Sequence, residues 1–212
     1  ALAVSLPYSI VSSLLRRVDP RGVKKAVAGG LLAASLLAAG GTLHPFIYGA
    51  LLPTLKNAGL YEGEVKNYWY WDSTRFIGYN PPSNDKTIHE VPLFTFVLGE
   101  LHGHALDIPA TLAATGVGSA LLLSPGAVRS ASPLRVPYAE AVGGVLLGAM
   151  WMTNTWDYPI YLLILLGAAV VHALRRHGAG VRALAETALA GATLVIVSQA
   201  AALPYTLHFE HF

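Results

Sequence analysis

The sequence predicts an all-α membrane protein, a polytopic bundle of about six membrane-spanning helices with one long outer loop. The composition and the hydropathy pattern lead to this fold class. The 212 residues are 54% hydrophobic and only 12% charged, with a mean hydropathy of +0.50, whereas soluble domains carry about 25% charged residues. Long apolar stretches also alternate with short basic or aromatic turns. We therefore expect an integral protein of the cytoplasmic membrane, surrounded by the lipid bilayer.

The composition also narrows the choice of partners and chemistry. A net charge of +2, without a basic patch interleaved with aromatic residues, argues against nucleic acid as a partner. The absence of cysteine from the sequence excludes disulfides, thiolate metal sites and a cysteine nucleophile. The chain starts within an apolar run at Ala1 and stops abruptly at Phe212. We expect residues 1–212 to form one transmembrane domain, the N-terminal part of a longer protein.

Six apolar stretches predict the membrane-spanning helices. The first is short for the roughly 20 residues that cross a bilayer, so we interpret it as the exit half of a span. The second is rich in alanine, glycine and leucine, and its small residues suit close helix packing. The six stretches are residues 1–15, 26–43, 110–123, 138–152, 160–174 and 184–203.

A long polar segment separates the second predicted span from the third. We expect residues 44–91 to form an extracytoplasmic loop, in which the aromatic run Tyr68–Trp71 is typical of the lipid headgroup level. His44 and Pro45 are expected to end the second span. Pro92 suits the first turn of a helix, and we predict that this helix continues to Leu123.

The basic residues predict the orientation of these spans. Cytoplasmic loops of membrane proteins carry an excess of lysine and arginine. With the spans above, ten of the 14 basic residues fall in turns on one side, near residues 16–25, 129–135 and 175–182, so this side is predicted to be cytoplasmic. Nine of the 12 acidic residues fall on the opposite side. The candidate functional residues are therefore expected on the extracytoplasmic side.

The strongest functional signal is a polar cluster within an apolar segment. Residues 91–109 contain Glu100, His102, His104 and Asp107 among mainly apolar neighbours. A charged side chain at membrane depth costs roughly 2.5 to 3.5 kcal/mol on insertion scales, so four ionisable groups here indicate a site. The alternative is that they lie at a helix end and are satisfied by solvent and backbone.

The geometry of this cluster depends on whether its helix is continuous. On one helix Glu100, His104 and Asp107 share a face, whereas a break at Gly103 would let His102 and His104 converge. Oxygen ligands suit Mg²⁺ or Mn²⁺, and two imidazoles favour Zn²⁺ or Mn²⁺. Glu100, His102 and His104 are therefore candidate metal ligands.

The outer loop adds two further polar motifs. Asp72 and Arg75 in W-D-S-T-R form an ion pair if this stretch is helical. Arg75 is also the one arginine predicted outside, and a guanidinium matches the geometry of phosphate better than an ammonium. Glu90 precedes the predicted helix start at Pro92, where an acid is favoured by the helix dipole, so a capping role is the alternative to a functional one.

The last motif is T-N-T-W-D-Y-P, residues 153–159, which forms a tight turn between two apolar stretches. Asn154 and Asp157 are its candidate site residues, because the predicted topology brings them to the side of Asp72 and Glu100. An Asx-type turn with aromatic membrane anchors is the alternative. The sequence lacks G-x-S-x-G, H-E-x-x-H and phosphate-binding glycine motifs, which argues against serine hydrolases, zincin proteases and ATP chemistry.

Three of these stretches resemble one known family. W-Y-W-D-S-T-R-F-I, T-I-H-E-V-P-L-F-T-F-V-L-G-E-L-H-G-H and T-N-T-W-D-Y-P, between about Trp69 and Tyr161, are similar in order and spacing to motifs of the YYY family of archaeal and Chloroflexota multispanning membrane proteins, a domain of unknown function. Glu100 stands where the family commonly has aspartate, and Gly103 replaces a frequent proline.

The resemblance implies the architecture of a C-type glycosyltransferase membrane core that uses lipid-phosphate sugars. The expected function is glycosyl transfer from a polyprenyl-phosphate sugar at the extracytoplasmic face. Asp72 or Glu100 would act as general base and Arg75 would neutralise the phosphate, with Glu100, His102 and His104 as metal ligands or phosphate-orienting groups. Glu90, Asp107, Asn154 and Asp157 would support the site, and the metal would be Mn²⁺, Mg²⁺ or Zn²⁺.

Two other functions remain open from the sequence. The chain could be a non-catalytic membrane subunit whose outer cluster binds partner membrane subunits. It could also be a metal-dependent membrane hydrolase. Convergence of Asp72, Arg75, Glu100 and Asp157 on one cavity would favour chemistry.

Overall fold

The computed structural model describes residues 1–41, 43–65, 70–75, 82–99, 102–123 and 138–209. These residues form helices, turns and loops, with no β-strand among them. The helices are α1 (Leu2–Val18), α2 (Val23–Ala39), α3 (His44–Phe46), the π-helix η1 (Ile47–Leu51), α4 (Leu52–Asn57), the 3₁₀ helix η2 (Tyr70–Thr74), α5 (Pro92–Leu98), α6 (Gly103–Leu123), α7 (Tyr138–Thr153), α8 (Asp157–His177) and α9 (Val181–His208). The predicted all-α fold class is confirmed.

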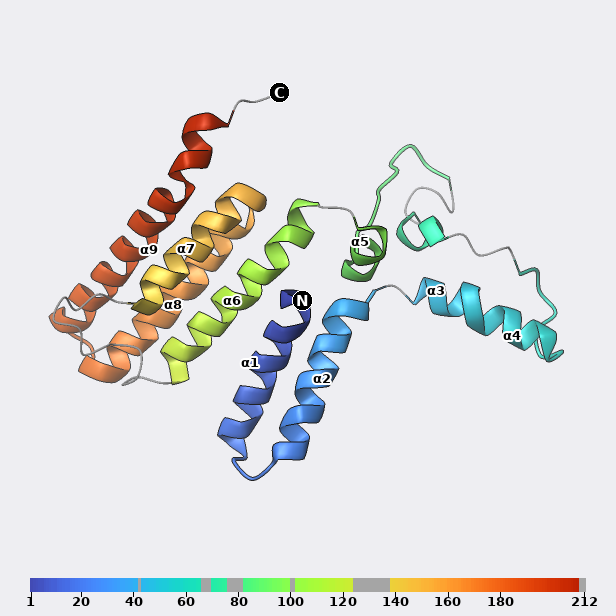
Figure 1. The fold of residues 1–212 in the computed structure, drawn as a ribbon, viewed down its shortest axis with the longest axis horizontal. Helices are drawn as coiled ribbons and strands as arrows, with labels where there is room; N and C mark the ends of the chain where they lie inside the picture. Colours follow the sequence, from blue (N-terminus) through green and yellow to red (C-terminus); the bar gives the residue numbers. More distant parts are fainter. Residues whose placement is uncertain (42, 66–69, 76–81, 100–101, 124–137, 210–212) are drawn as a thin grey trace.

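Helices α6 to α9 pack side by side as a bundle (Figure 1). Its core is formed by buried apolar side chains that come from all four helices, namely Ala114, Leu147, Met150, Leu165 and Leu194. The outer faces are apolar as well, since Leu163 is 70% exposed and Ile196 is 68% exposed. A helix that is apolar on all sides is typical of a membrane span, because lipid then contacts the face that the core does not.

Small residues set the distance between α7 and α9. A Cβ atom at Gly148 would lie 2.8 Å from the Ser198 carbonyl oxygen and 2.8 Å from the Ala201 Cβ atom. At Gly144 it would lie 2.7 Å from the Val197 Cβ atom. These glycines let the two backbones approach closely, which is how membrane helices gain packing contacts where lipid is as apolar as leucine.

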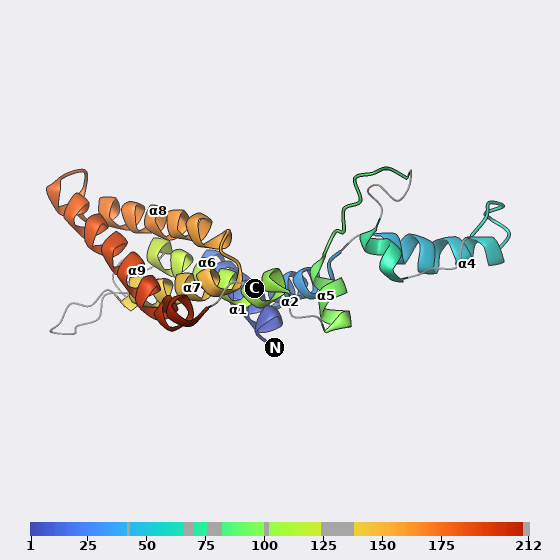
Figure 2. The same cartoon turned by 90° about the horizontal axis from the view of Figure 1, so that it is seen from above.

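Helices of the N-terminal half pack beside the bundle, where α1 and α5 contact α6. Helices α1 and α2 form a hairpin, and α1 contacts α6. Helix α5 contacts both α2 and α6. The α3–α4 segment projects away from the bundle in both views (Figures 1 and 2).

Three of the described helices are long and apolar enough to cross a membrane, namely α6, α8 and α9. The pair α2 and α3–α4 would add a fourth if it is one span bent by 82°. Helices α1, α2 and α7 have 16 or 17 residues, at the lower limit for a span. Each of the six predicted stretches falls on a helix, so an integral helical protein is supported, and the number of spans stays a prediction.

Two predicted helix boundaries were wrong. The helix that begins at Pro92 ends at Leu98, because Gly99 takes a left-handed conformation with φ of 67°, which glycine adopts without a Cβ penalty. Helix α6 then starts at Gly103, so His104 and Asp107 lie on one helix, while the expected continuous helix from Pro92 to Leu123 is interrupted before them. Helix α2 ends at Ala39, and His44 and Pro45 begin α3 rather than ending the second span, since proline suits a first helical turn.

The bundle has two ends of different character. The acid end, named for Asp107 and Asp157, is where α6 and α8 begin and α7 and α9 end (Figure 1). The basic end, named for Arg17 and Arg175, is where α6 and α8 end, and the α1–α2 turn lies beside the end of α6. Arg17 donates a hydrogen bond to the Leu123 carbonyl and Arg175 donates one to the Leu122 carbonyl, over 2.8 Å. Basic residues from two separate turns therefore share one end, as the predicted alternation of spans requires.

The close contact of α7 and α9 predicts the response to an added methyl group. We expect Gly148→Ala to destabilise the protein by about 1 to 3 kcal/mol, because the new Cβ atom overpacks the Ser198 backbone. Thermal unfolding in detergent measures this change. The matched control is Gly167→Ala in α8, where nothing lies within 4 Å of the added atom. Equal stability of the two variants would contradict the role given to Gly148.

Candidate functional site

Asp107 is the buried centre of the acid end. It lies in the second turn of α6, and only 1% of the residue is exposed. The Thr153 hydroxyl at the end of α7 donates a hydrogen bond to Asp107 Oδ1 over 2.7 Å. Helix α6 approaches α7 here because residue 103 is glycine, and a Cβ atom on Gly103 would lie 2.6 Å from the Thr153 carbonyl oxygen. The structure thus joins the polar cluster segment, through Asp107, to the T-N-T-W-D-Y-P motif, through Thr153.

The turn after α7 adds a second carboxylate to this group. The Asn154 amide donates a hydrogen bond to Asp157 Oδ2 over 2.7 Å, and the Asp157 backbone N–H donates one to the Asn154 carbonyl over 3.0 Å. Asp157 lies in the first turn of α8, where the helix dipole favours an acid. The turn is closed by this backbone hydrogen bond and by the side-chain pair of Asn154 and Asp157, with no side-chain cap hydrogen bond at the start of α8.

The carboxyl groups of Asp107 and Asp157 also interact with each other. Asp107 Oδ2 is buried and no described donor reaches it. Two carboxylates that are poorly solvated repel each other. A shared proton, a hydroxyl donor or a cation between them relieves that repulsion.

A polar network missed by the sequence analysis supports the same end. The Tyr158 and Ser198 hydroxyls lie 3.1 Å apart, and the Gln199 amide donates to the Tyr158 hydroxyl over 3.4 Å. The rings of Trp151 and Tyr158 meet edge to face, with centroids 5.4 Å apart. Tyr158, for which a membrane anchor was one alternative, thus ties α8 to α7 and α9 next to Asp157.

Of the other predicted residues of the cluster segment, the structure describes His102 and His104. His102 Nδ1 lies 3.4 Å from Glu90 Oε1, which links the segment before α5 to the segment before α6. His104 is exposed. Glu100 lies outside the described residues. Among the residues that the structure describes, no three histidine, aspartate or glutamate side chains lie close enough together to hold a metal ion. The metal site of Glu100, His102 and His104 stays a prediction.

Arg75 is held against an aromatic surface. Its guanidinium carbon lies 4.9 Å from the Trp71 ring centroid, and Trp71 meets Phe94 of α5 edge to face at 5.4 Å. The Arg75 backbone N–H donates to the Asp72 carbonyl over 3.3 Å. Asp72 lies half-buried in η2. Helix η2 thus presents both side chains beside α5, while the Asp107 group lies between α6, α7 and α8.

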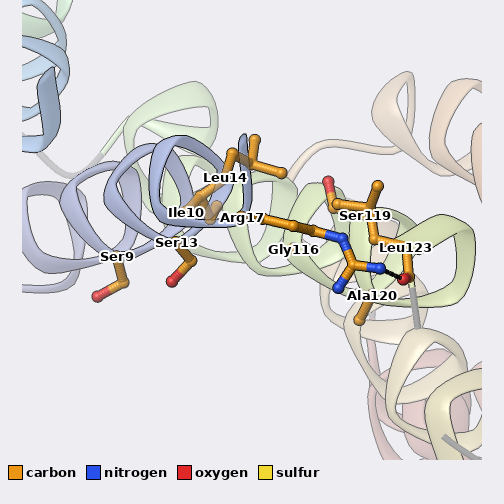
Figure 3. Close-up of a pocket in the computed structure, with 9 residues that line it drawn as sticks. All are labelled: Ser9, Ile10, Ser13, Leu14, Arg17, Gly116, Ser119, Ala120 and Leu123. Carbon is orange, nitrogen blue, oxygen red and sulfur yellow. Dashed lines mark hydrogen bonds between the residues drawn. The ribbon is translucent and has the colours of Figure 1, made fainter. Parts of the chain in front are cut away.

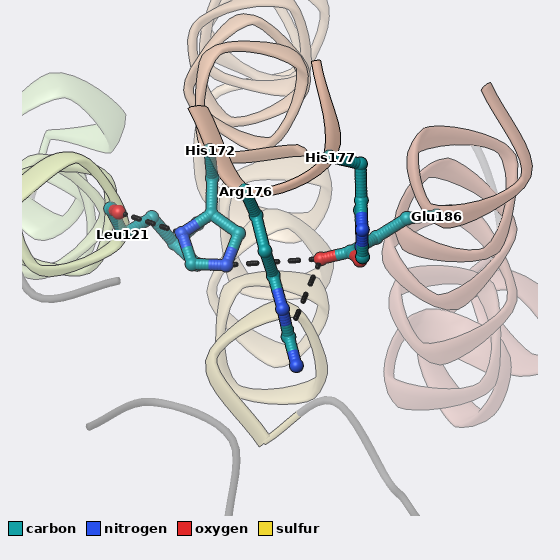
Figure 4. A network of polar contacts seen from close by, with 5 residues as sticks. All are labelled: Leu121, His172, Arg176, His177 and Glu186. Carbon is teal, nitrogen blue, oxygen red and sulfur yellow. Dashed lines mark hydrogen bonds and ion pairs between the residues drawn. The ribbon is translucent and has the colours of Figure 1, made fainter. Parts of the chain in front are cut away.

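A second buried polar cluster lies at the basic end, and the sequence analysis missed it (Figure 4). Glu186 of α9 is 9% exposed, and its Oε2 lies 2.6 Å from His177 Nε2. His172 Nε2 lies 3.7 Å from Glu186 Oε1, and its Nδ1 lies 3.0 Å from the Leu121 carbonyl, to which it donates. Arg176 Nη1 lies 4.0 Å from Oε1. The sequence does not indicate this cluster, because His172 and His177 lie near the end of α8 and their partner Glu186 lies on the next helix.

The outer faces and the buried polar contacts define the class of this molecule as an all-helical membrane protein. The chain belongs to the family described as "Uncharacterized membrane protein (DUF2298)", whose match covers residues 1–212. No curated protein and no solved structure matches the chain. The expected membrane domain of unknown function is thereby confirmed, and the archaeal or Chloroflexota origin and the likeness to glycosyltransferases stay predictions.

The Asp107 hydrogen bond gives a stability prediction. We expect Thr153→Val to lower the free energy of unfolding by about 1 to 3 kcal/mol, because it removes the donor to a buried carboxylate oxygen at nearly constant side-chain shape. Unfolding in detergent measures the loss. Thr155→Val is the control, since Thr155 is exposed and its hydroxyl contacts only the Trp151 carbonyl, at 3.2 Å. A loss of the same size in both variants would show that Asp107 does not depend on Thr153.

The two ends of the bundle give a topology prediction. The sequence has no cysteine, so single cysteines report their side of the membrane without background. Trp156 at the acid end is 82% exposed and Val18 at the basic end is 85% exposed. In right-side-out vesicles we expect an impermeant maleimide to label Trp156→Cys directly and Val18→Cys only after permeabilisation. Labelling of both from one side would contradict the opposite placement of the two ends.

Proposed function

We propose that this protein is a membrane-embedded glycosyltransferase that uses a polyprenyl-phosphate sugar at the extracytoplasmic face. The observation that carries the proposal is the burial of Asp107 beside Asp157, two acids from different motifs that meet at one end of the bundle. Acidic residues among membrane helices are costly and mark binding or reaction sites. The resemblance of the three outer motifs to the YYY family supports the same class of chemistry.

In the proposed reaction, Asp72 or Glu100 removes the proton of an acceptor hydroxyl. The hydroxyl oxygen then forms a bond to the anomeric carbon of the sugar, while the bond between that carbon and the phosphate oxygen breaks. The electron pair of the broken bond stays on the polyprenyl phosphate. Arg75 neutralises the charge that develops there, and its stacking on Trp71 at 4.9 Å orients the planar guanidinium for that task.

The acid-end group would hold the substrate rather than take its proton. Asp107 and Asp157 accept hydrogen bonds from sugar hydroxyls in this proposal, with Asn154 orienting Asp157. Glu90 and His102, 3.4 Å apart, would support the entry to α6. A divalent metal, Mn²⁺, Mg²⁺ or Zn²⁺, belongs to the proposal through Glu100 with His102 and His104.

The apolar surface beside the acid end suits a polyprenyl chain. Ile160 at the start of α8 is 52% exposed, and Leu203 and Leu207 near the end of α9 are 51% and 68% exposed. A lipid-phosphate donor that places its tail along such a face would bring its phosphate to the membrane surface. The exposed apolar side chains thus favour a lipid-linked donor over a soluble nucleotide sugar.

A second candidate function is supported by the projecting α3–α4 segment (Figure 2). Its exposed apolar side chains include Leu43, 70% exposed, and Phe46, 59% exposed. A segment of this kind can lie against another membrane subunit. A non-catalytic subunit of a larger assembly is therefore the alternative to an enzyme.

The transferase proposal predicts the effect of removing single carboxylates. In liposomes supplied with polyprenyl-phosphate mannose and polyprenyl-phosphate glucose, with water as the acceptor hydroxyl that receives the sugar, we expect release of polyprenyl phosphate by the wild-type protein. Asp72→Asn is expected to slow this release by about 10² to 10⁴-fold if Asp72 is the general base, and Glu100→Gln if Glu100 is. Asp157→Asn is expected to raise the KM for the donor more than it lowers kcat.

The control variant is Asp85→Asn, because Asp85 is an exposed acid of the same outer segment. Dialysis against EDTA before the assay tests the metal, and unchanged release would remove it from the proposal. Full release by both Asp72→Asn and Glu100→Gln would end the assignment of the base. No release by the wild-type protein, together with copurification of other membrane subunits, would favour the non-catalytic alternative.

A further inference from the structure

A groove between α1 and α6 opens at the basic end of the molecule (Figure 3). Its volume is about 390 Å³, within the range of 300 to 1,000 Å³ typical of ligand pockets. Both walls are regular helix faces, since their residues recur at helical spacing. The groove is lined by Ser9, Ile10, Ser13, Leu14 and Arg17 of α1 and by Gly116, Ser119, Ala120 and Leu123 of α6.

The α1 wall carries a polar stripe on an otherwise apolar helix. Ser9, Ser13 and Arg17 follow one another at intervals of four residues, which places them on one helix face, and all three are exposed. The facing side of α6 leaves room for the groove, because Gly116 and Ala120 have little or no side chain. The groove therefore has serine side chains on both walls, apolar side chains between them, and the charge of Arg17 at its mouth.

Arg17 is fixed at the mouth of the groove by the end of α6. One N–H group of its guanidinium donates to the Leu123 carbonyl, which belongs to the last residue of the helix. Arg175 and His172 of α8 donate in the same way to the Leu122 and Leu121 carbonyls. Among the described residues no acidic side chain forms an ion pair with Arg17, so the guanidinium keeps its charge and further donors for a ligand.

The surroundings of the groove select an anionic ligand. Arg16, Arg21 and Lys24 lie in or beside the α1–α2 turn, and Lys25 pairs with Asp19 at 3.6 Å on the surface. Basic pockets between membrane helices bind anionic lipid headgroups. We propose that this groove binds one anionic phospholipid, with the lipid phosphate on Arg17 and Ser13 and an acyl chain along Gly116 and Ala120.

This site is distinct from the proposed transferase site. It lies at the opposite end of α6 from Asp107, and none of its lining residues belongs to the three outer motifs. The proposed occupant is a diacyl lipid rather than free phosphate, because the groove lies beside α6, a helix long and apolar enough to cross a membrane, and is lined by apolar as well as polar side chains. Binding of the lipid would add to the direct contacts of α1 with α6, which include Ile10 beside Gly116 and the hydrogen bond from Arg17 to the Leu123 carbonyl.

Native mass spectrometry of the purified protein with added phosphatidylglycerol tests this inference. We expect one tightly bound phosphatidylglycerol per chain and several-fold weaker binding of phosphatidylcholine. Arg17→Gln is expected to weaken phosphatidylglycerol binding about fivefold, the contribution of one basic side chain. Ala120→Leu, which fills the groove without removing a charge or a hydrogen bond, is expected to weaken it as well.

The matched control is Arg175→Gln, which removes the same charge and a similar carbonyl contact from the same end but lies outside the groove. Equal losses of phosphatidylglycerol binding in Arg17→Gln and Arg175→Gln would show that general surface charge causes the binding, and this result would overturn the site. Wild-type binding by Ala120→Leu would do the same. Displacement of the lipid by excess inorganic phosphate would show that the groove binds a free anion rather than a phospholipid, and would overturn the proposal.

Two further outcomes are readable in the same spectra. If Arg17→Gln does not fold in a thermal scan, the headgroup comparison and Ala120→Leu decide the question. A dimer of the wild-type protein that Ala120→Leu dissociates would show that a second copy occupies the groove, and this result would overturn the lipid proposal.

Discussion

The constraint on which this structure depends is that a polar group between membrane helices has to find its partner within the protein. Bilayer hydrocarbon offers no hydrogen bonds, and an unsatisfied polar group there costs several kcal/mol. Asp107, 1% exposed, meets this constraint at Oδ1 through the Thr153 hydroxyl, while no described donor reaches its Oδ2. At the other end, the last carbonyls of α6 are satisfied by Arg17, Arg175 and His172. Helix α6 is thus anchored at both ends by side chains of its neighbours.

Close packing of small residues makes these contacts possible. Gly144 and Gly148 bring α7 against α9, and Gly103 brings the start of α6 against the end of α7. The second contact is what places Thr153 within hydrogen-bonding distance of Asp107. Packing and chemistry are therefore coupled in this bundle, since a residue with a side chain at 103 would separate the acids that the proposed function needs together.

The two ends of the bundle carry different polar groups and have different proposed roles. The acid end gathers carboxylates and amides that accept hydrogen bonds, while η2 presents Arg75 on Trp71 beside α5. The basic end gathers guanidinium and imidazole groups, with Glu186 buried among His172, His177 and Arg176. A bundle with its charges separated in this way has a defined direction in the membrane, because lysine and arginine favour the cytoplasmic side.

The hydropathy pattern alone was sufficient for the all-α class and for six stretches that fall on helices, because apolar length and charge are local properties of the chain. It was also sufficient to assign Asn154 and Asp157 to one turn. Local pattern did not reveal the break at Gly99, since a left-handed glycine ends a helix without changing its hydropathy. The contacts of Asp107 with Thr153, of Glu186 with His177 and of Arg17 with Leu123 join residues on different helices. Only the tertiary structure decided these contacts, because they depend on how far apart and in which register the helices pack.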